Sequence, residues 1–194
     1  MRIFGVILAG GAGRRMGGAD KALLVLAGET LIFRAVARLE PQVERLAISA
    51  NGDLARFRSF GLPVLADADR QGPLSGVLAG LLWAAARGAD ALVTAPVDCP
   101  FLPPDLVPRL WLAGAGGVAI AESGGTLHPT FGLWPVRLAA PLADFLTSGA
   151  KPRVRDFALA QAMQPARFAD DGSFANLNTP EDLARVESLL RAQR

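Results

Sequence analysis

The hydrophobic positions of the chain fall into short apolar runs separated by longer stretches with helical spacing, the pattern of strands alternating with helices. The opening run, Ile3 to Ala9, is short, apolar and followed by glycines, so it predicts a buried strand. Similar runs predict strands at residues 46–50, 62–66, 91–97, 117–121, 130–134 and 164–168. Helical spacing predicts helices at residues 23–26, 31–39, 54–60, 77–86, 103–112, 135–146, 156–162 and from 180 onward.

Strands and helices alternate through residue 112, which is typical of a parallel, doubly wound sheet. The fully apolar run 91–97 favours a central strand, whereas Pro63 favours an edge position or the first residues of its strand. The connection between 117–121 and 130–134 is too short for a crossover helix, so these strands are expected to be antiparallel. We therefore expect a Rossmann-like α/β fold, mainly parallel with one antiparallel strand, in a single domain over residues 1–194.

A glycine-rich loop, residues 10–21, follows the first predicted strand and reads GGAGRRMGGADK. Glycines allow backbone N–H groups to approach an anion closely, and the loop's arginines and lysine add charge-assisted contacts to phosphate oxygens. Ligands of open α/β sheets bind at the carboxyl ends of the strands, where this loop begins. The loop therefore predicts a phosphate site, although an ordinary turn with solvated arginines is the simpler alternative.

Two common phosphate-binding motifs do not fit this loop. Gly13 and Gly18 have the spacing of a Walker A motif, but two residues intervene before Lys21 and no Ser or Thr follows. Gly11 and Gly13 begin a dinucleotide fingerprint, but Met16 occupies the place of its third glycine. A nicotinamide-dependent oxidoreductase is therefore disfavoured.

Polar side chains follow the other predicted strands: Asn51 and Asp53, then Asp67, then Asp98. Because the carboxyl ends of parallel strands meet at one edge, these groups should face the glycine-rich loop. Such an arrangement holds a nucleoside triphosphate together with Mg²⁺. Asp98, after the most apolar strand, is the best metal ligand, and Asp67 could accept hydrogen bonds from a base or ribose. Each carboxylate could instead cap a helix or stabilise a turn.

Composition narrows the class of protein. The 194 residues are 51% hydrophobic and 20% charged, which indicates a globular chain. A net charge of +2 without long basic runs argues against nucleic-acid binding. No uninterrupted apolar stretch of about 18 residues predicts a membrane span. The single cysteine, Cys99, excludes an internal disulfide and favours a reducing, cytoplasmic location.

Cys99 and His128 are weak candidates for chemistry. Cys99 has no recognisable histidine partner and is expected to be a packed thiol. The sole histidine, His128, cannot form a histidine metal cluster and precedes Pro129 in a predicted turn, where it is either a turn residue or a substrate contact.

The C-terminal third holds a second polar set. Residues 151–155 form a cationic cluster, which could also be a solvated loop. Asn176 and Asn178 lie on the same side of an extended segment and could reach a metal, a phosphate or a pterin-like ring edge. Thr179 and Pro180 are an N-cap and a first helical residue, so an asparagine turn before a capped helix is the alternative.

Several stretches together resemble a known family. Residues 8–21 resemble the L-A-G-G-x-x-x-R-M-G-x-x-K signature of nucleoside-triphosphate transferases, whose fold is that of the nucleotide-diphospho-sugar transferases. Over nearly the whole chain, further segments narrow the resemblance to molybdenum cofactor guanylyltransferases: GPLSG at 72–76, PVDCPFLP at 96–103, HPT at 128–130 and NLNTPEDL at 176–183.

The resemblance implies an Mg²⁺-dependent transfer of GMP from GTP to the terminal phosphate of molybdopterin, with release of pyrophosphate. It implies GTP binding by the N-terminal half, at Leu8, Ala9, Gly10, Gly11, Lys21, Ser49, Asn51, Asp67 and Asp98. It implies molybdopterin binding by the C-terminal half, assisted by the loop, at Arg15, Gly18, Arg153, Asn176 and Asn178. A base-binding asparagine of the family falls on Ser49 here, with Asn51 two residues further on.

Arg15, Lys21 and Asp98 are the expected catalytic residues, with Asp98 as the metal ligand. An acceptor phosphate is already ionised near neutral pH, so alignment and charge neutralisation suffice without a general base. Transient contacts with molybdenum-insertion proteins and molybdoenzyme chaperones are also expected. The alternatives are a cytidylyltransferase for the same cofactor, another nucleotidyltransferase, or a non-catalytic nucleotide-binding module.

Overall fold

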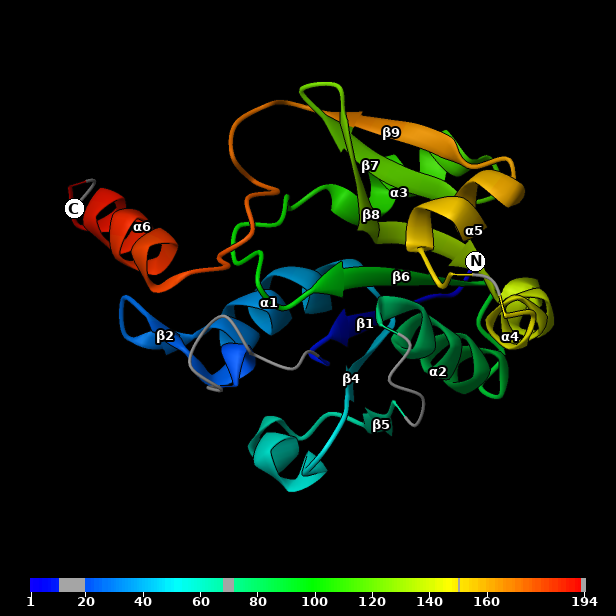
Figure 1. The fold of residues 1–194 in the computed structure, drawn as a ribbon, viewed down its shortest axis with the longest axis horizontal. Coiled ribbons are helices and arrows are strands. Elements are labelled where there is room, and N and C mark those ends of the chain that lie inside the picture. Colours follow the sequence, from blue (N-terminus) through cyan, green and yellow to red (C-terminus); the bar gives the residue numbers. More distant parts are fainter. Residues whose placement is uncertain (11–19, 68–71, 150, 193–194) are drawn as a thin grey trace.

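A sheet of seven strands organises the computed structural model, which describes residues 1–10, 20–67, 72–149 and 151–192 (Figure 1). Within these residues the strand order is β5-β4-β1-β6-β8-β7-β9. The strands are β1 (Ile3–Leu8), β4 (Arg45–Ala50), β5 (Val64–Ala66), β6 (Ala91–Pro96), β7 (Ala119–Ser123), β8 (Thr126–Pro135) and β9 (Gln164–Phe168).

The direction of the strands confirms the predicted fold class. β8 pairs antiparallel with both β6 and β7, while the pairs β1–β4, β1–β6, β4–β5 and β7–β9 are parallel. β5 lies at one edge and begins directly after Pro63, as expected for a residue that cannot donate to a ladder. The predicted antiparallel hairpin is β7–β8, which carries an irregularity between Ile120 and Ala121.

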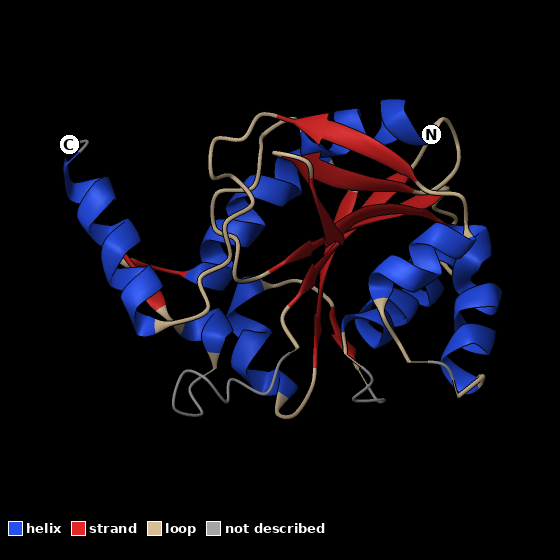
Figure 2. Cartoon of the chain, turned by 45° about the horizontal axis from the view of Figure 1, so that its top comes forward, coloured by secondary structure: helices blue, strands red, loops and turns tan. Residues whose placement is uncertain are grey.

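Helices cover both faces of this sheet (Figure 2). Alternate strand residues point to opposite faces, so Ile7 and Val93 enter one core while Val6 and Leu92 enter the other. Each fully buried side chain of this size contributes about 1.5–3 kcal/mol relative to an exposed one. The first core is covered by α1 (Leu31–Leu39) and α3 (Leu106–Gly114), the second by α2 (Pro73–Ala85), α4 (Ala139–Thr147) and α5 (Val154–Ala160).

Two glycines let α2 lie unusually close to the strands. A Cβ on Gly80 would stand 2.7 Å from Leu92 Cδ2, and a Cβ on Gly76 would stand 2.8 Å from both Leu8 Cδ2 and Ser49 Oγ. Neither site has room for a larger residue without movement of its neighbours. The GPLSG segment thereby places the first turn of α2 beside the carboxyl ends of β1 and β4.

The helix predicted at residues 23–26 is wrong. Residues Lys21–Leu23 form a single 3₁₀ turn (η2), followed by a hairpin of β2 (Val25–Leu26) and β3 (Glu29–Thr30). Its two connecting residues, Ala27 and Gly28, both have positive φ, which is the geometry of a tight two-residue hairpin turn. The predicted cap of the next helix is confirmed, because Thr30 Oγ1 accepts a hydrogen bond from the Phe33 N–H at 3.3 Å.

Several other boundaries differ from the prediction. α2 starts at Pro73 rather than at residue 77, because proline fits the first helical position. α3 starts later than expected, at Leu106, and α5 starts at Val154, inside the predicted cationic loop. The remaining elements are η3 (Glu40–Gln42), η4 (Leu54–Phe60), η5 (Val136–Leu138) and α6 (Pro180–Ala192). No helix in the described ranges is long and apolar enough to cross a membrane.

Candidate active site

The carboxyl ends of four adjacent parallel strands bring the predicted nucleotide residues together. Leu8 is paired with Ser49 of β4 on one side and with Pro96 of β6 on the other. The Ala9 N–H donates to the Ser49 carbonyl at 2.8 Å, which extends the ladder by one residue toward Gly10. The expectation that strand-end residues share one edge is therefore confirmed for the described part of the chain.

One corner of this edge combines an amide, a carboxylate and a residue without a side chain. A Cβ on Gly10 would stand 3.4 Å from Asp67 Oδ2 and 3.6 Å from Asn51 Nδ2. The Asp67 N–H donates to the Ala50 carbonyl at 2.9 Å, which fixes the main chain at the end of β5. Glycine at position 10 therefore leaves open a space bordered by a hydrogen-bond acceptor and an amide donor.

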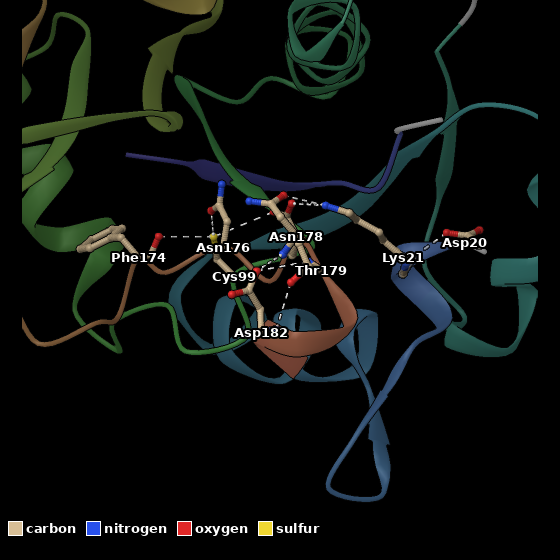
Figure 3. A network of polar contacts seen from close by, with 10 residues as sticks. Asp20, Lys21, Cys99, Phe174, Asn176, Asn178, Thr179 and Asp182 are labelled. Carbon is tan, nitrogen blue, oxygen red and sulfur yellow. Dashed lines mark hydrogen bonds and ion pairs between the residues drawn. The ribbon is translucent and has the colours of Figure 1, made fainter. Parts of the chain in front are cut away.

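Lys21 joins two groups that are remote in sequence. Its Nζ lies 3.2 Å from Asp98 Oδ2 and donates to Asn178 Oδ1 at 2.8 Å (Figure 3). The side chains of Lys21 and Asp98 keep 23% and 19% of their surface exposed, so a ligand can still reach both. The turn that carries Lys21 is capped by Asp20, whose Oδ1 accepts from the Ala22 N–H at 3.0 Å.

Arg56 on η4 is a further residue of this edge, and the sequence reasoning missed it. Its Nε forms an ion pair with the Asp20 carboxylate, and its Nη1 donates to the Asn51 carbonyl at 2.8 Å and to the Asp53 carbonyl. It thus ties the end of the glycine-rich loop to the turn after β4. Asp53 itself caps η4, since its Oδ1 accepts from the Ala55 N–H at 2.9 Å.

Residues 174–179, here called the acceptor segment because the sequence predicts that they bind the acceptor substrate, lie against the end of β6. The Leu177 N–H donates to the Asp98 carbonyl at 2.9 Å. The buried Cys99 thiol donates to Asn176 Oδ1 at 2.6 Å and has the Phe174 carbonyl at 3.7 Å as a second acceptor (Figure 3). Asn178 therefore contacts Lys21, and Asn176 contacts Cys99, the residue after Asp98.

The start of α6 holds the acceptor segment from its other end. Asp182 Oδ2 accepts from the N–H groups of Asn178 and Thr179, at 3.1 Å each, and Thr179 Oγ1 accepts from the Asp182 N–H at 3.1 Å. This reciprocal cap confirms Thr179 as the N-cap. The hydrogen bond from the Asn178 N–H, followed by that from Thr179, lowers the pKa of Asp182.

Cys99 and His128 differ in their surroundings. Cys99 is a packed thiol, as predicted, and its burial, followed by the charge of Asp98, raises its pKa well above the usual range. His128 lies within β8 rather than in a turn, because that strand starts at Thr126. Its Nε2 is 2.8 Å from Ser123 Oγ, and its ring stacks on Phe174 with the centroids 4.7 Å apart. His128 therefore packs behind the acceptor segment.

The side chains at this edge suit a metal ion whose remaining ligands come from its substrate. The described residues contain no group of three or more His, Cys, Asp or Glu side chains placed to hold a metal ion. Mg²⁺ is commonly bound by one or two carboxylates together with substrate phosphates and water, and not by a full protein cage. Asp98, a partly exposed carboxylate beside a lysine, fits such a site.

Some predicted site residues are not brought to this edge by the structure. Gly11, Arg15 and Gly18 lie outside the described residues. Arg153 is described; it precedes α5 and its side chain is exposed. Among the described residues, the hydrogen bonds and ion pairs do not join Arg153 to the acceptor segment, and α5 and α6 lie far apart in Figure 1. Its role remains a prediction.

A carboxylate, a lysine and exposed amides at the carboxyl edge of parallel strands form a ligand site of the kind found in α/β proteins that bind nucleotides. Residues 5–163 match the MobA-like NTP transferase domain, and the chain is 64% identical to a molybdenum cofactor guanylyltransferase from Cereibacter sphaeroides, over 98% of both chains. The chain belongs to the molybdenum cofactor guanylyltransferase family of MobA-like NTP transferases.

Solved structures show the same fold at low sequence identity. Molybdopterin-guanine dinucleotide biosynthesis protein A from Archaeoglobus fulgidus has a TM-score of 0.74 at 21% identity, over 97% of this chain and 99% of that one. A Mycobacterium tuberculosis protein in complex with manganese has a TM-score of 0.70 at 16% identity, over 97% of this chain and 99% of that one.

Proposed function

We propose that this chain transfers GMP from GTP to the terminal phosphate of molybdenum-bearing molybdopterin, forming the molybdopterin guanine dinucleotide cofactor and pyrophosphate. The observation that carries the proposal is the position of Lys21, in contact with both Asp98 and Asn178. A donor nucleotide at the strand ends and an acceptor at residues 174–179 would meet at this ammonium group.

The nucleotide would lie over the carboxyl ends of β1, β4 and β5. Leu8, Ala9, Gly10 and Gly11 would offer main-chain groups to it. Guanine carries two N–H donors on its pairing edge, and the Asp67 carboxylate is a matching acceptor. Ser49 is only 1% exposed because α2 covers it, so we assign the direct amide contact to Asn51 and a supporting role to Ser49.

The metal would be Mg²⁺ held by Asp98, and the manganese complex of a protein with this fold supports a divalent ion. When bound, Mg²⁺ would supply positive charge to the phosphate oxygens at the reaction centre. Lys21 would hold the carboxylate in place and bring its own charge to the same oxygens. Arg15, in the glycine-rich loop, would neutralise the leaving pyrophosphate.

The reaction needs little proton chemistry from the protein. The attacking group is a phosphate oxygen, whose last pKa of about 6 leaves it largely ionised at neutral pH. A bond forms between this oxygen and the α-phosphorus of GTP while the bond to the β-phosphate oxygen breaks. Catalysis then rests on alignment and charge, with Gly18, Arg153, Asn176 and Asn178 proposed to orient the acceptor.

The test is a nucleotide panel with molybdopterin and Mg²⁺ in which pyrophosphate is measured. GTP should support release and CTP should not, whereas preference for CTP would indicate a cytidylyltransferase. GTP binding without pyrophosphate release would indicate a non-catalytic module.

A matched pair of carboxylate variants tests the role of Asp98. Asp98→Asn keeps the shape but removes the charge, and we expect kcat to fall by about 10²-fold or more, as when one preorganised electrostatic contact is lost. Asp105→Asn makes the same change in an exposed pair with Arg109 and should leave turnover unchanged. Normal turnover of Asp98→Asn would refute the metal role.

We also propose that the enzyme acts in the cytoplasm, in line with its single cysteine, and passes its product on in transient contacts with molybdenum-insertion proteins and molybdoenzyme chaperones.

A further inference from the structure

The acceptor segment is held against the turn after β6, which carries Asp98, by groups of three kinds. The main chain is fixed by the Leu177 N–H, which donates to the Asp98 carbonyl. The side chain of Asn178 is held by Lys21, and that of Asn176 by Cys99. Residues 98 and 99, directly after β6, therefore contact the donor side and the acceptor side of the site at once.

These partners dictate which way each amide faces. A lysine ammonium group can only donate hydrogen bonds, so it requires the oxygen of Asn178 and turns its NH₂ group the other way. The Cys99 thiol likewise presents its S–H to the oxygen of Asn176. Figure 3 shows the amide nitrogens of both side chains turned away from these partners. Two NH₂ donors are thus left for a ligand.

We propose that Cys99 is a positioning residue for the acceptor substrate, whose thiol fixes the Asn176 amide so that it and Asn178 both present donors to an anionic phosphate group. The inference rests on the proposed function and names what the acceptor segment recognises. A phosphate monoester carries only acceptors when ionised, so two outward NH₂ groups match it. Cys99 does not touch the substrate; it acts through Asn176.

The place of Cys99 suggests that its thiol orients a side chain and does not hold the segment together. The main chain stays fixed by the contact with the Asp98 carbonyl and by Asp182 at the start of α6. Without the S–H donor, the oxygen of Asn176 and the carbonyl of Phe174 would be two acceptors facing an apolar group. The amide would then lose its fixed direction. Asp98 Oδ1 lies 4.0 Å from the thiol, a much longer contact than the one with Asn176, so loss of the thiol should affect the GTP side far less.

Two substitutions separate hydrogen bonding from packing. Cys99→Ser keeps a donor but loses part of the buried apolar volume, whereas Cys99→Val keeps the apolar volume and removes the donor. We expect Cys99→Val to raise KM for molybdopterin by about tenfold, the scale of one lost hydrogen bond to a charged group, with KM for GTP unchanged. Cys99→Ser should keep both KM values at those of the wild type.

Equilibrium binding of molybdopterin, followed by pterin fluorescence without GTP, gives a readout that does not depend on turnover. The dissociation constant should rise for Cys99→Val and not for Cys99→Ser. A defect in the serine variant alone, a parallel rise of both KM values, or no effect of either change would overturn the proposal. Failure of the wild type to release pyrophosphate would overturn the proposed function instead, and the binding comparison would still decide the role of Cys99.

If Cys99→Val does not fold, Asn176→Asp tests the same proposal. It keeps an oxygen facing Cys99 but replaces the outward donor by a charged acceptor. We expect molybdopterin binding to be lost while GTP binding remains, and unchanged molybdopterin binding would overturn the proposal.

Discussion

At the scale of single residues, Lys21 is where the two proposed substrate sites meet. Its ammonium group lies 2.8 Å from Asn178 Oδ1 and 3.2 Å from Asp98 Oδ2. A compact charge on a flexible stem can move between these partners and an incoming phosphate, which a planar guanidinium could not do in the same space. The contacts of Lys21 also hold the proposed metal-binding carboxylate beside a cation before any ligand arrives.

His128 carries a pH dependence of stability. Burial lowers its pKa, and the charge of Asp170 offsets this only in part. The unfolded chain, with a histidine pKa of about 6.5, therefore binds a proton more readily than the folded one. The neutral ring therefore makes its full contribution to the free energy of unfolding at pH values above the pKa of the unfolded chain. This contribution is lost as the pH falls below that value. Because His128 is the sole histidine, few other groups titrate there.

We expect the free energy of unfolding, measured by urea denaturation, to decrease between about pH 7 and pH 5, and His128→Gln to flatten this slope. The same ring stacks on Phe174, so acid should also weaken the acceptor segment. Parallel pH profiles for the wild type and His128→Gln would contradict this account.

At the scale of elements, η4 holds the end of the glycine-rich loop at Asp20. Arg56 of η4 pairs with Asp20, which directly precedes Lys21, and also binds the Asn51 carbonyl at the end of β4. The pair is largely shielded, with 19% and 28% of the two side chains exposed. It thereby fixes the distance between the proposed base site and the proposed phosphate site.

A double-mutant cycle tests this support. Arg56→Gln and Asp20→Asn should each raise KM for GTP several-fold, and the double variant should be no worse than the poorer single one. The coupling energy should then be about 1 kcal/mol, within the range found for residues that share one network. Arg58→Gln, on the same η4 but exposed, should change nothing. Additive effects of Arg56→Gln and Asp20→Asn would show that the pair does not act as a unit.

The sequence predicts elements well where local patterns are strong. β9 spans Gln164–Phe168 as predicted, and the single antiparallel strand follows from a connection too short for a helix. The β2–β3 hairpin was missed because Ala27 adopts a positive φ, which alanine gives no reason to expect. Residues at strand ends were predictable from topology alone, since parallel strands share their carboxyl edge.

The contacts that complete the site were not predictable. Cys99 meets Asn176, 77 positions away, and Lys21 meets Asn178, 157 positions away. Such pairs depend on the path of the chain around the sheet, and no local spacing encodes them. Arg56 belongs to no motif either; only the fold places its guanidinium between Asp20 and the end of β4.

At the scale of the whole molecule, the two halves of the chain share their cores. β6 and β8 join the halves in one sheet, through pairs such as Leu92 with Trp134. One core combines Ile7 with Leu133, and the other combines Val6 with Trp134. Neither half buries its apolar residues alone, so the predicted single domain should unfold as one unit although its halves are proposed to bind different substrates.

This predicts one cooperative transition, with tryptophan fluorescence and circular dichroism giving the same midpoint. The fluorescence reports on both halves, because Trp83 lies in α2 and Trp134 in β8.

GTP with Mg²⁺ at about 100 times its Kd should stabilise the fold by about 2.7 kcal/mol, or roughly 5–10 °C in Tm, in that same transition. Asp98→Asn should lose only the metal-dependent part of the shift. Two transitions, with GTP moving just one, would mean that the halves fold separately and that Lys21 joins two domains.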